Sequence, residues 1–255
     1  MRSRTVGFVL TLIFGLILGL VFALAPSLHA MTGREIMEKS DELPEADTAA
    51  SKMLMKIHKG GRVIEKEFIL QMKQFENDED KALISFIRPT RIKLLTHSHK
   101  GREDDQWLRL SSGRVKRVAS SSKSKPFVNS HFYYEDLTSV NIDDYEYELL
   151  GDGEAAGHPC YKVKGVKVAG ERVYDKGVFY ARKSDYFIQR IDFYKDGEFH
   201  KYMENRHVKK IDGILTPRQV VMARADGRGR TELILEGVKY NIEIDSVRFR
   251  KEALR

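Results

Sequence analysis

The 255-residue sequence contains a single cysteine, Cys160. One thiol cannot close an internal disulfide, so the chain is not a disulfide-stapled scaffold. Cys160 follows His158 and Pro159 beside a predicted turn, and the sequence shows no evident pairing with a base that would activate it as a nucleophile. We therefore interpret Cys160 as a buried structural thiol.

The short motifs that mark the common enzyme classes are also missing. The sequence has no nucleophile elbow, no zinc-protease histidine pair, no phosphate-binding P-loop and no dinucleotide fingerprint. Serine runs at 111–112 and 120–122 have no His and Asp in a recognisable arrangement. Catalytic triads are assembled in space rather than in sequence, so a hydrolase stays as an alternative. We expect a protein that is not an enzyme and that uses no cofactor.

Metal-ligand patterns are sparse as well. His97 and His99 lie two residues apart on a predicted strand and therefore share one face. A zinc site needs at least a third protein ligand, and the sequence indicates none. We interpret the two as surface histidines and predict no metal site.

The excess of basic residues is mild. The chain has 44 Lys and Arg against 37 Asp and Glu, a formal net charge of +7. Without Arg2 and Arg4 the counts are 42 and 37, which leaves +5. Such an excess favours anionic membrane surfaces or acidic partners. The basic residues are spread along predicted strands and form no nucleic-acid-binding motif, so we expect a surface of mixed sign and no nucleic-acid partner.

An apolar run from residue 6 to residue 25 follows Arg2 and Arg4 at the start of the chain. With a small residue at the cleavage point, residues 1–30 have the order of a secretory signal. The run is about twenty residues long, enough to span a bilayer, so a retained anchor is the alternative. In both cases residues 31–255, predicted to be one domain, lie outside the cytoplasm. No cysteine lies directly after the run, which excludes the lipid-anchored form of secretion.

Most of the remaining chain alternates between apolar and polar residues. A helix is predicted at 32–43, where Thr32 can cap and Glu35 follows three positions later. A strand at 52–58 is then joined to a longer one at 62–75 by two glycines, which suit a two-residue hairpin turn. Further strands are predicted at 81–87, 92–99, 106–110, 114–119, 145–150, 161–168, 177–182, 187–195, 198–211, 215–225 and 231–242. Regular short strands with turns between them indicate an antiparallel sandwich or barrel rather than βαβ units.

The first predicted hairpin carries an apolar face that could line a cavity. Methionine is abundant there, and its flexible side chain fills irregular apolar space and adapts to varied ligands. The cavity-lining candidates are Met53, Met55, Ile57, Ile64, Phe68, Leu70 and Met72. The alternative is that they are ordinary core residues, and periodicity does not separate the two.

One stretch interrupts the strand pattern. Residues 120–126 are rich in Ser and Lys, which predicts an exposed loop, and residues 127–140 follow with a concentration of aromatic side chains. We interpret the second part as a plug or lid over an apolar space, with an ordinary helix packed on a sheet as the alternative. The lid candidates are Phe132, Tyr133, Tyr134 and Leu137.

Four segments carry a resemblance to a known family. They are KALISFIRPTRIKLLTHSHKG (81–101), QWLRLSSGRVKRVASSSKSKPFVNSHFYYEDL (106–137), SDYFIQRIDFYKDGE (184–198) and KKIDGILTPRQVVM (209–222). The chain resembles the LolA/LolB-like outer-membrane lipoprotein-sorting proteins, in the branch with a TP0789-like domain. The similarity extends over nearly all of residues 31–255, and the end of the second segment is its most specific part.

The resemblance implies a mainly β fold: a curved, incomplete antiparallel barrel with short helices closing the mouth. It also implies a periplasmic carrier that shields the acyl chains of lipoproteins or lipids during transfer towards the outer membrane. The expected partners are a lipid or acylated lipoprotein and an inner-membrane transporter or exporter, and the expected state is a monomer. A lipid-active hydrolase and an accessory lipid-binding subunit of an exporter are the alternatives.

Individual residues also carry roles by resemblance. Arg88-Pro89 matches an Arg-Pro pair that fastens the lid over the empty cavity, so Arg88→Leu is expected to loosen the lid and raise ligand retention. Trp107 matches a tryptophan on the next strand and is expected to pack inside the barrel. The stretch 111–126 is longer and more basic than in the better-studied carriers, so the cargo need not be a lipoprotein.

Overall fold

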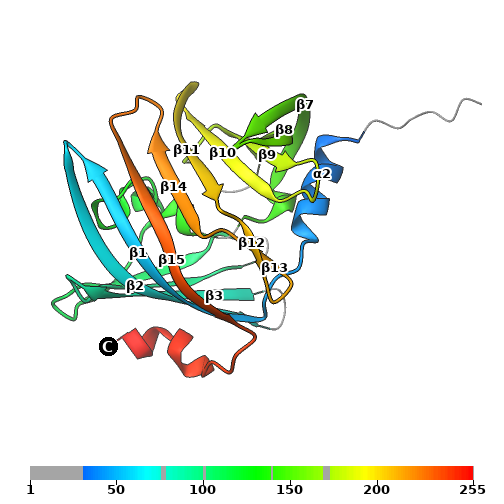
Figure 1. Ribbon diagram of the computed structural model, residues 1–255. Coiled ribbons are helices and arrows are strands. Elements are labelled where there is room, and N and C mark those ends of the chain that lie inside the picture. The colour runs from blue at the N-terminus through cyan, green and yellow to red at the C-terminus, as the bar shows by residue number, and fades with distance from the viewer. Residues whose placement is uncertain (1–30, 76–78, 100–101, 139, 169–172, 255) are drawn as a thin grey trace, which may run out of the picture. The chain divides into compact units, whose positions relative to one another are not determined.

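The computed structural model describes residues 31–75, 79–99, 102–138, 140–168 and 173–254 (Figure 1). The described elements belong to one compact unit, Thr32–Arg255. The predicted secretory signal at 1–30 lies outside the described residues. Within the described ranges, no helix has both the length and the apolar character needed to cross a bilayer.

Thirteen antiparallel strands form one large sheet. Its order is β6-β5-β4-β3-β2-β1-β15-β14-β11-β10-β9-β8-β7. The strands of the first half are β1 (Thr48–Lys59), β2 (Arg62–Phe75), β3 (Glu79–Arg88), β4 (Lys93–His97), β5 (Asp105–Arg109) and β6 (Val115–Arg117). Those of the second half are β7 (Tyr145–Ala155), β8 (His158–Lys167), β9 (Lys176–Arg182), β10 (Ile188–Lys195), β11 (Glu198–Arg206), β14 (Gln219–Arg224) and β15 (Gly229–Tyr240). The strand ladder joins the two halves where β1 pairs with β15.

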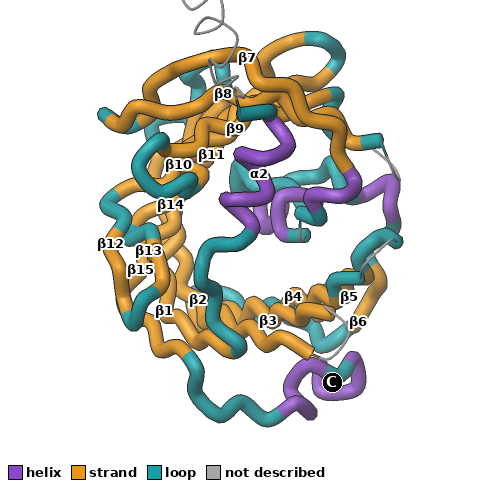
Figure 2. The backbone as a smooth tube through the Cα atoms, turned by 90° about the vertical axis from the view of Figure 1, so that its right-hand side faces the viewer, coloured by secondary structure: helices purple, strands orange, loops and turns teal. Residues whose placement is uncertain are grey.

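The sheet curls around an interior without closing into a barrel, as Figure 2 shows. Strands β6 and β7 form its two edges, and within the described residues no ladder joins them. This confirms the mainly β, curved and incomplete antiparallel barrel predicted for the chain.

The local signals in the sequence place the first elements well. Lys59 pairs with Arg62, so Gly60 and Gly61 form the two-residue turn of the β1–β2 hairpin. Both glycines have positive φ, +57° and +73°, as a primed turn requires. By contrast, the predicted strands at 198–211 and 215–225 are each interrupted, and a separate small hairpin of β12 (Lys209–Ile211) and β13 (Ile214–Thr216) lies between β11 and β14.

Helix α2 (Gly33–Asp41) confirms the helix prediction at 32–43 with a slightly earlier end. Thr32 and Glu35 form the reciprocal capping box that their spacing indicates. The helix packs on β7 so closely that a Cβ on Gly33 would lie 2.8 Å from the backbone nitrogen of Leu149. Glycine is therefore required here by close approach rather than by its backbone angles.

The two faces of the curled sheet have separate cores. On the concave face, Met53, Phe68, Ile84 and Leu94 belong to one apolar cluster that includes Phe127 from the interior segment. On the convex face, Leu83 and Leu95 pack with residues of the C-terminal 3₁₀ turns η7 (Ser246–Phe249) and η8 (Lys251–Leu254). These turns lie outside the curl, below β3 in Figure 1. The alternation of neighbouring residues between the two clusters is the period of two of a strand.

The C-terminal cover supports the convex core through Phe249, whose ring is 1% exposed and packs 6.0 Å from that of Phe75. We expect Phe249→Ala to lower the free energy of unfolding by about 3–5 kcal/mol, because it removes a buried aromatic side chain and leaves a cavity. Val247→Ala is the matched control, since Val247 lies in the same turn but is 48% exposed. Urea unfolding of both variants tests this, and equal losses would contradict the role of Phe249.

Candidate functional site

Residues 118–137 fill the interior of the curled sheet, and we call this segment the plug. It contains three short 3₁₀ turns, η3 (Ser120–Ser122), η4 (Phe127–Asn129) and η5 (Glu135–Leu137). An isolated bridge between Pro126 and Tyr133 folds the segment back on itself. The described part of this stretch therefore has short 3₁₀ turns in place of the ordinary helix that the sequence left as the alternative, and its role as a lid stays a prediction.

The plug covers the apolar concave wall of the first five strands. Rings form a continuous chain from the wall into the plug: Phe68 to Phe86 at 5.2 Å, Phe86 to Phe127 at 5.7 Å and Phe127 to Tyr134 at 5.4 Å between centroids. Leu137 packs against the same cluster, and Phe132 is 3% exposed. Three of the four lid candidates are thus buried or packed against apolar residues, and the fourth, Tyr133, makes the polar contacts described below.

Most cavity-lining candidates lie under the plug. Met53, Met55, Ile57 and Phe68 are buried in the concave cluster, and Leu70 packs against it. Ile64 and Met72 remain 49% and 44% exposed. They pair across the ladder with Ile57 and Ala49, so they share the concave face with the buried set and lie at its two uncovered ends.

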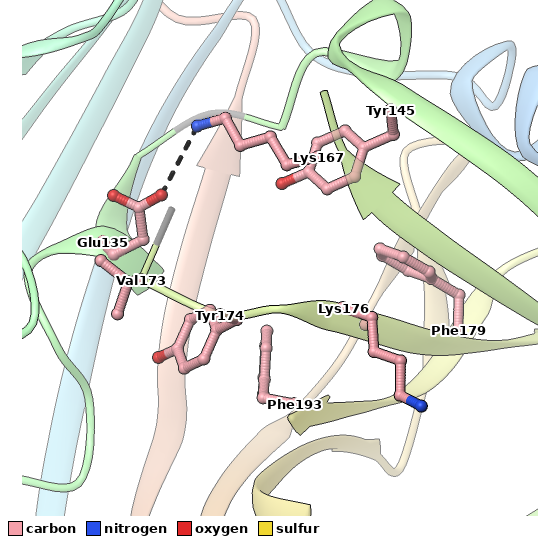
Figure 3. Close-up of a pocket in the computed structure, with 9 residues that line it drawn as sticks. Glu135, Tyr145, Lys167, Val173, Tyr174, Lys176, Phe179 and Phe193 are labelled. Atoms are coloured by element: carbon pink, nitrogen blue, oxygen red, sulfur yellow. Dashed lines mark ion pairs between the residues drawn. The ribbon is translucent and has the colours of Figure 1, made fainter. Parts of the chain in front are cut away.

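The aromatic pocket of the second half of the sheet is small in this conformation. Tyr145, Tyr174, Phe179 and Phe193 surround a cavity of about 40 Å³, with the ion pair of Lys167 and Glu135 at one side (Figure 3). Sites for drug-sized ligands measure about 300–1,000 Å³, so this cavity cannot hold an acyl chain as it stands. The aromatic pocket would therefore have to widen before it could take up an acyl chain.

A buried ion pair fastens the plug to the second half of the sheet. Nζ of Lys201 on β11 lies 2.5 Å from Oδ2 of Asp136, and the two side chains are 3% and 2% exposed. The Asp136 carboxylate also accepts hydrogen bonds from the Tyr133 amide at 2.6 Å and from the Tyr174 hydroxyl at 2.6 Å. Lys201 donates a second hydrogen bond to the carbonyl oxygen of His131 at 3.0 Å. Buried charges are tolerated when they are paired and hydrogen-bonded in this way.

The pKa shifts around the Asp136–Lys201 pair follow from its burial. Desolvation lowers the pKa of Lys201, while Asp136 opposes that shift. Desolvation also raises the pKa of Tyr174, and the neighbouring Asp136 charge raises it further. The Lys201 ammonium lies 3.7 Å from the centre of the Tyr133 ring, a cation–π contact that adds to the pair.

Charged and neutral contacts hold the rest of the plug, and the charged ones are the ion pairs of Lys123 with Glu103 at 3.2 Å and of Glu135 with Lys167 at 3.6 Å. His131 donates its backbone amide to Oγ1 of Thr231 on β15 at 3.0 Å, and its ring Nδ1 lies 2.8 Å from the same oxygen. Its ring also lies over Gly229, where a Cβ would be 2.6 Å from Nε2. Near the other half of the sheet, the buried Gln106 side chain donates to the carbonyl oxygen of Tyr134 at 3.1 Å.

The structure places two residues named by the resemblance away from the plug. The Arg88 side chain is 73% exposed and forms an ion pair with Glu67 on the neighbouring strand, and the described residues show no hydrogen bond from it to the plug. Pro89 follows it through a cis peptide bond. In this conformation no contact supports the lid-fastening role expected of Arg88. Asp136 and Lys201 instead make a contact between the plug and the sheet.

Trp107 lies on the convex face of the sheet, whereas the resemblance implies that it packs inside the barrel. It packs with the convex cluster under the C-terminal turns, and its ring lies 4.8 Å from that of His97. Its strand neighbours Gln106 and Leu108 are the residues that face the plug. Trp107 therefore does not line the interior.

Comparison with known proteins gives the family context. A family model described as that of an uncharacterized protein matches residues 78–255. No curated protein matches the chain. Among solved structures, a DUF1329 family protein from Desulfovibrio piger is 27% identical, with a TM-score of 0.83, and the match covers 88% of this chain and 98% of that one.

Two further solved structures are similar. A putative outer membrane lipoprotein-sorting protein domain from Vibrio parahaemolyticus is 28% identical, with a TM-score of 0.82 over 87% of this chain and 97% of that one. A LolA superfamily protein from Nitrosomonas europaea is 19% identical, with a TM-score of 0.67 over 88% of this chain and all of that one. At 19% identity, the similarity to the Nitrosomonas europaea protein shows a common fold.

The buried pair predicts a distinctive pattern of stability. Lys201→Met should destabilise the protein by about 3–5 kcal/mol, because it leaves the Asp136 carboxylate buried without its cation. The double variant Lys201→Met/Asp136→Asn should recover most of that loss. Urea unfolding of the wild type, both single variants and the double variant measures the coupling, and strictly additive losses would show that the pair does not act as a unit.

The plug should also respond to mild acid through His131. Burial, together with the nearby charges of Lys59, Arg224 and Lys201, lowers the pKa of its imidazole to about 4. Between pH 6.5 and 4 the unfolded chain binds a proton that the folded chain excludes, so the free energy of unfolding falls as the pH falls through this window. We expect His131→Asn to have a shallower decline than the wild type when unfolding is measured across it.

A matched variant controls for general acid effects. His207 is exposed in the turn that follows β11, away from the plug contacts described above. His207→Asn should therefore parallel the wild type across the same window. A decline in His131→Asn as steep as that of the wild type would remove His131 as its cause.

Proposed function

We propose that this chain, which belongs to the family whose model matches residues 78–255, is a periplasmic carrier of lipids or lipoproteins. Its similarity to an outer membrane lipoprotein-sorting domain and its LolA-like fold support the proposal. In this proposal the concave wall takes up acyl chains during transfer towards the outer membrane. An inner-membrane transporter or exporter would supply the cargo. The observation that carries the proposal is an apolar wall covered by a segment that polar contacts, rather than a continuous strand ladder, hold in place.

The physical need for a carrier follows from the hydrophobic effect. Each methylene group moved out of water is worth roughly 0.8 kcal/mol, so an acyl chain of ordinary length does not cross water unaided at useful rates. The concave wall supplies suitable surface through Met53, Met55, Ile57 and Phe68. Methionine accommodates chains of different shape, which suits a carrier of varied cargo.

The plug makes uptake an exchange. Phe127, Tyr134 and Leu137 occupy the wall now, so an entering acyl chain replaces contacts that the protein already makes with itself. The net gain is the difference between two apolar contacts, which allows binding to be reversible. A two-position segment of this kind is an established way to couple binding with release.

The filled interior favours one second candidate. An accessory subunit of a membrane exporter would bind its partner with the plug in place and carry no cargo. It would give a stable complex with a membrane protein and no co-purifying lipid, whereas a carrier gives acyl chains that native mass spectrometry detects.

A pair of glycine variants tests the carrier proposal. Gly229→Ala should displace His131, loosen the plug and raise the fraction of protein that retains lipid, measured by native mass spectrometry after incubation with phospholipid vesicles. Gly237→Ala is the control, since Gly237 lies on the same strand with open space where its Cβ would be. Arg88→Leu should match the wild type because Arg88 pairs with Glu67. Lipid absent from every variant would contradict the carrier role.

A further inference from the structure

A cavity of about 430 Å³ opens where the plug meets the ends of three strands. Its walls come from the end of β1, the start of β11, the β14–β15 turn and the part of the plug around Pro126 and Tyr133. The charged or titratable residues among those that line it are Lys59, His131, Tyr133, His200, Lys201, Arg224 and Arg228.

The charge of this cavity is strongly one-sided. Four permanent cations line it, and no carboxylate is among the lining residues. Two carboxylates lie close by: Asp136 pairs with Lys201, and Asp226 is shared by Arg224 and Arg228 at 2.6 Å and 2.8 Å. With both counted, the group keeps a net charge of +2, and Lys59 is the lining cation that neither carboxylate pairs with in the described contacts.

The pKa values of the two lining histidines, His131 and His200, reflect the same positive charge. Their pKa values are lowered first by burial and then by neighbouring cations, which for His131 are Lys59, Arg224 and Lys201 and for His200 include Lys201 and Arg224. At neutral pH both rings are therefore uncharged and can donate or accept hydrogen bonds. His200 Nε2 already lies 2.8 Å from the Tyr133 hydroxyl, which orients that pair at the wall of the cavity.

The cavity adjoins the apolar interior. Pro126 lines it, and the next residue, Phe127, is 1% exposed in the concave cluster. His131 lines it, and Phe132 beside it is 3% exposed. A ligand with an anionic end and an apolar end could therefore contact polar and apolar parts of the plug that lie one or two residues apart.

We propose that this cavity, the cationic pocket, binds a phosphate oxyanion, and that its source is the headgroup of the lipid whose acyl chains the concave wall takes up. The chemistry is that of charge-assisted hydrogen bonds from Lys and Arg to phosphate oxygens. Arg224 and Arg228 donate Nε and Nη2 to Asp226, and their remaining guanidinium N–H groups can engage phosphate oxygens, while Lys59 adds a point charge at the cavity wall. The lipid source rests on the proposed function, whereas the oxyanion site itself does not.

Isothermal titration calorimetry with three probes tests the proposal. The probes are inorganic phosphate, sn-glycerol 3-phosphate, and dihexanoyl phosphatidylglycerol below its micelle concentration. We expect all three to bind and the short-chain lipid to bind at least tenfold more tightly than glycerol phosphate. Equal affinity for the lipid and the two free phosphates would identify a free phosphate ester as the source and overturn the headgroup assignment.

A charge-removing double variant ties the binding to this pocket. Lys59→Gln/Arg228→Gln removes two exposed lining cations and leaves Lys201 and the buried pair intact. Each lost charge-assisted contact is worth about tenfold in affinity, so all three probes should bind on the order of a hundredfold more weakly. Arg114→Gln/Lys116→Gln lowers the net charge equally at exposed positions near β6 and should bind like the wild type.

The outcomes separate this proposal from the carrier function. A similar affinity for the double variant and the wild type would overturn the cationic pocket, even if lipid co-purifies with both. Conversely, loss of phosphate binding in the double variant, with no acyl chain found on any variant, would support the oxyanion site and count against the carrier. Thermal unfolding of each variant confirms that it is folded before it is titrated.

Discussion

The buried contact between Asp136 and Lys201 joins the plug to the sheet, and the rest of the interior depends on it. A curled sheet with one strongly apolar concave face must cover that face with something. Here the cover comes from an irregular segment with little regular secondary structure of its own. A buried ion pair is weak evidence for high stability, because desolvation offsets much of the attraction. Its geometric demands, however, fix where Asp136 and its neighbours lie, so the pair specifies one closed arrangement.

In this arrangement the plug occupies the surface that the proposed cargo would contact. The wall residues meet aromatic and aliphatic side chains of the plug at ordinary contact distances, as the ring chain from Phe68 to Tyr134 shows. The apolar surface is therefore shielded whether or not a ligand is present. Among the described cavity-lining candidates of the first hairpin, Ile64 and Met72 are the exposed ones, and they lie at the ends of the concave face. A structure of this kind avoids the exposure of a large apolar patch, which would otherwise promote aggregation.

The parts of the fold that sequence alone predicts are those set by local chemistry. The glycine turn after Lys59 and the capping box at Thr32 depend on a few adjacent residues, and both are present. Alternation predicts which residues share a face, but it does not say which face is concave. The resemblance implies that Trp107 packs inside, whereas the structure places it against the convex cluster. The resemblance gave the fold correctly and drew attention to Arg88, whose contact in this chain is a neighbouring strand.

The Asp136–Lys201 pair could not be predicted from the sequence. Asp136 follows the aromatic run 132–134 and sits beside Glu135, so its sequence neighbours do not distinguish it from a solvated carboxylate. Lys201 gives no hint either, because a lysine on a strand is ordinarily solvated and its partner is 65 residues away. Only the strand order, which brings β11 against the plug, makes the pair apparent.

The lone thiol described at the outset has a chemical consequence in this fold. Cys160 is fully buried in β8, its sulfur faces the carbonyl oxygen of His158 at 3.2 Å, and burial raises its pKa. The thiolate is the reactive form, so oxidants and other sulfhydryl groups find little to attack. Two copies of the folded chain therefore cannot become covalently linked to each other through sulfur, even where the surroundings are oxidising.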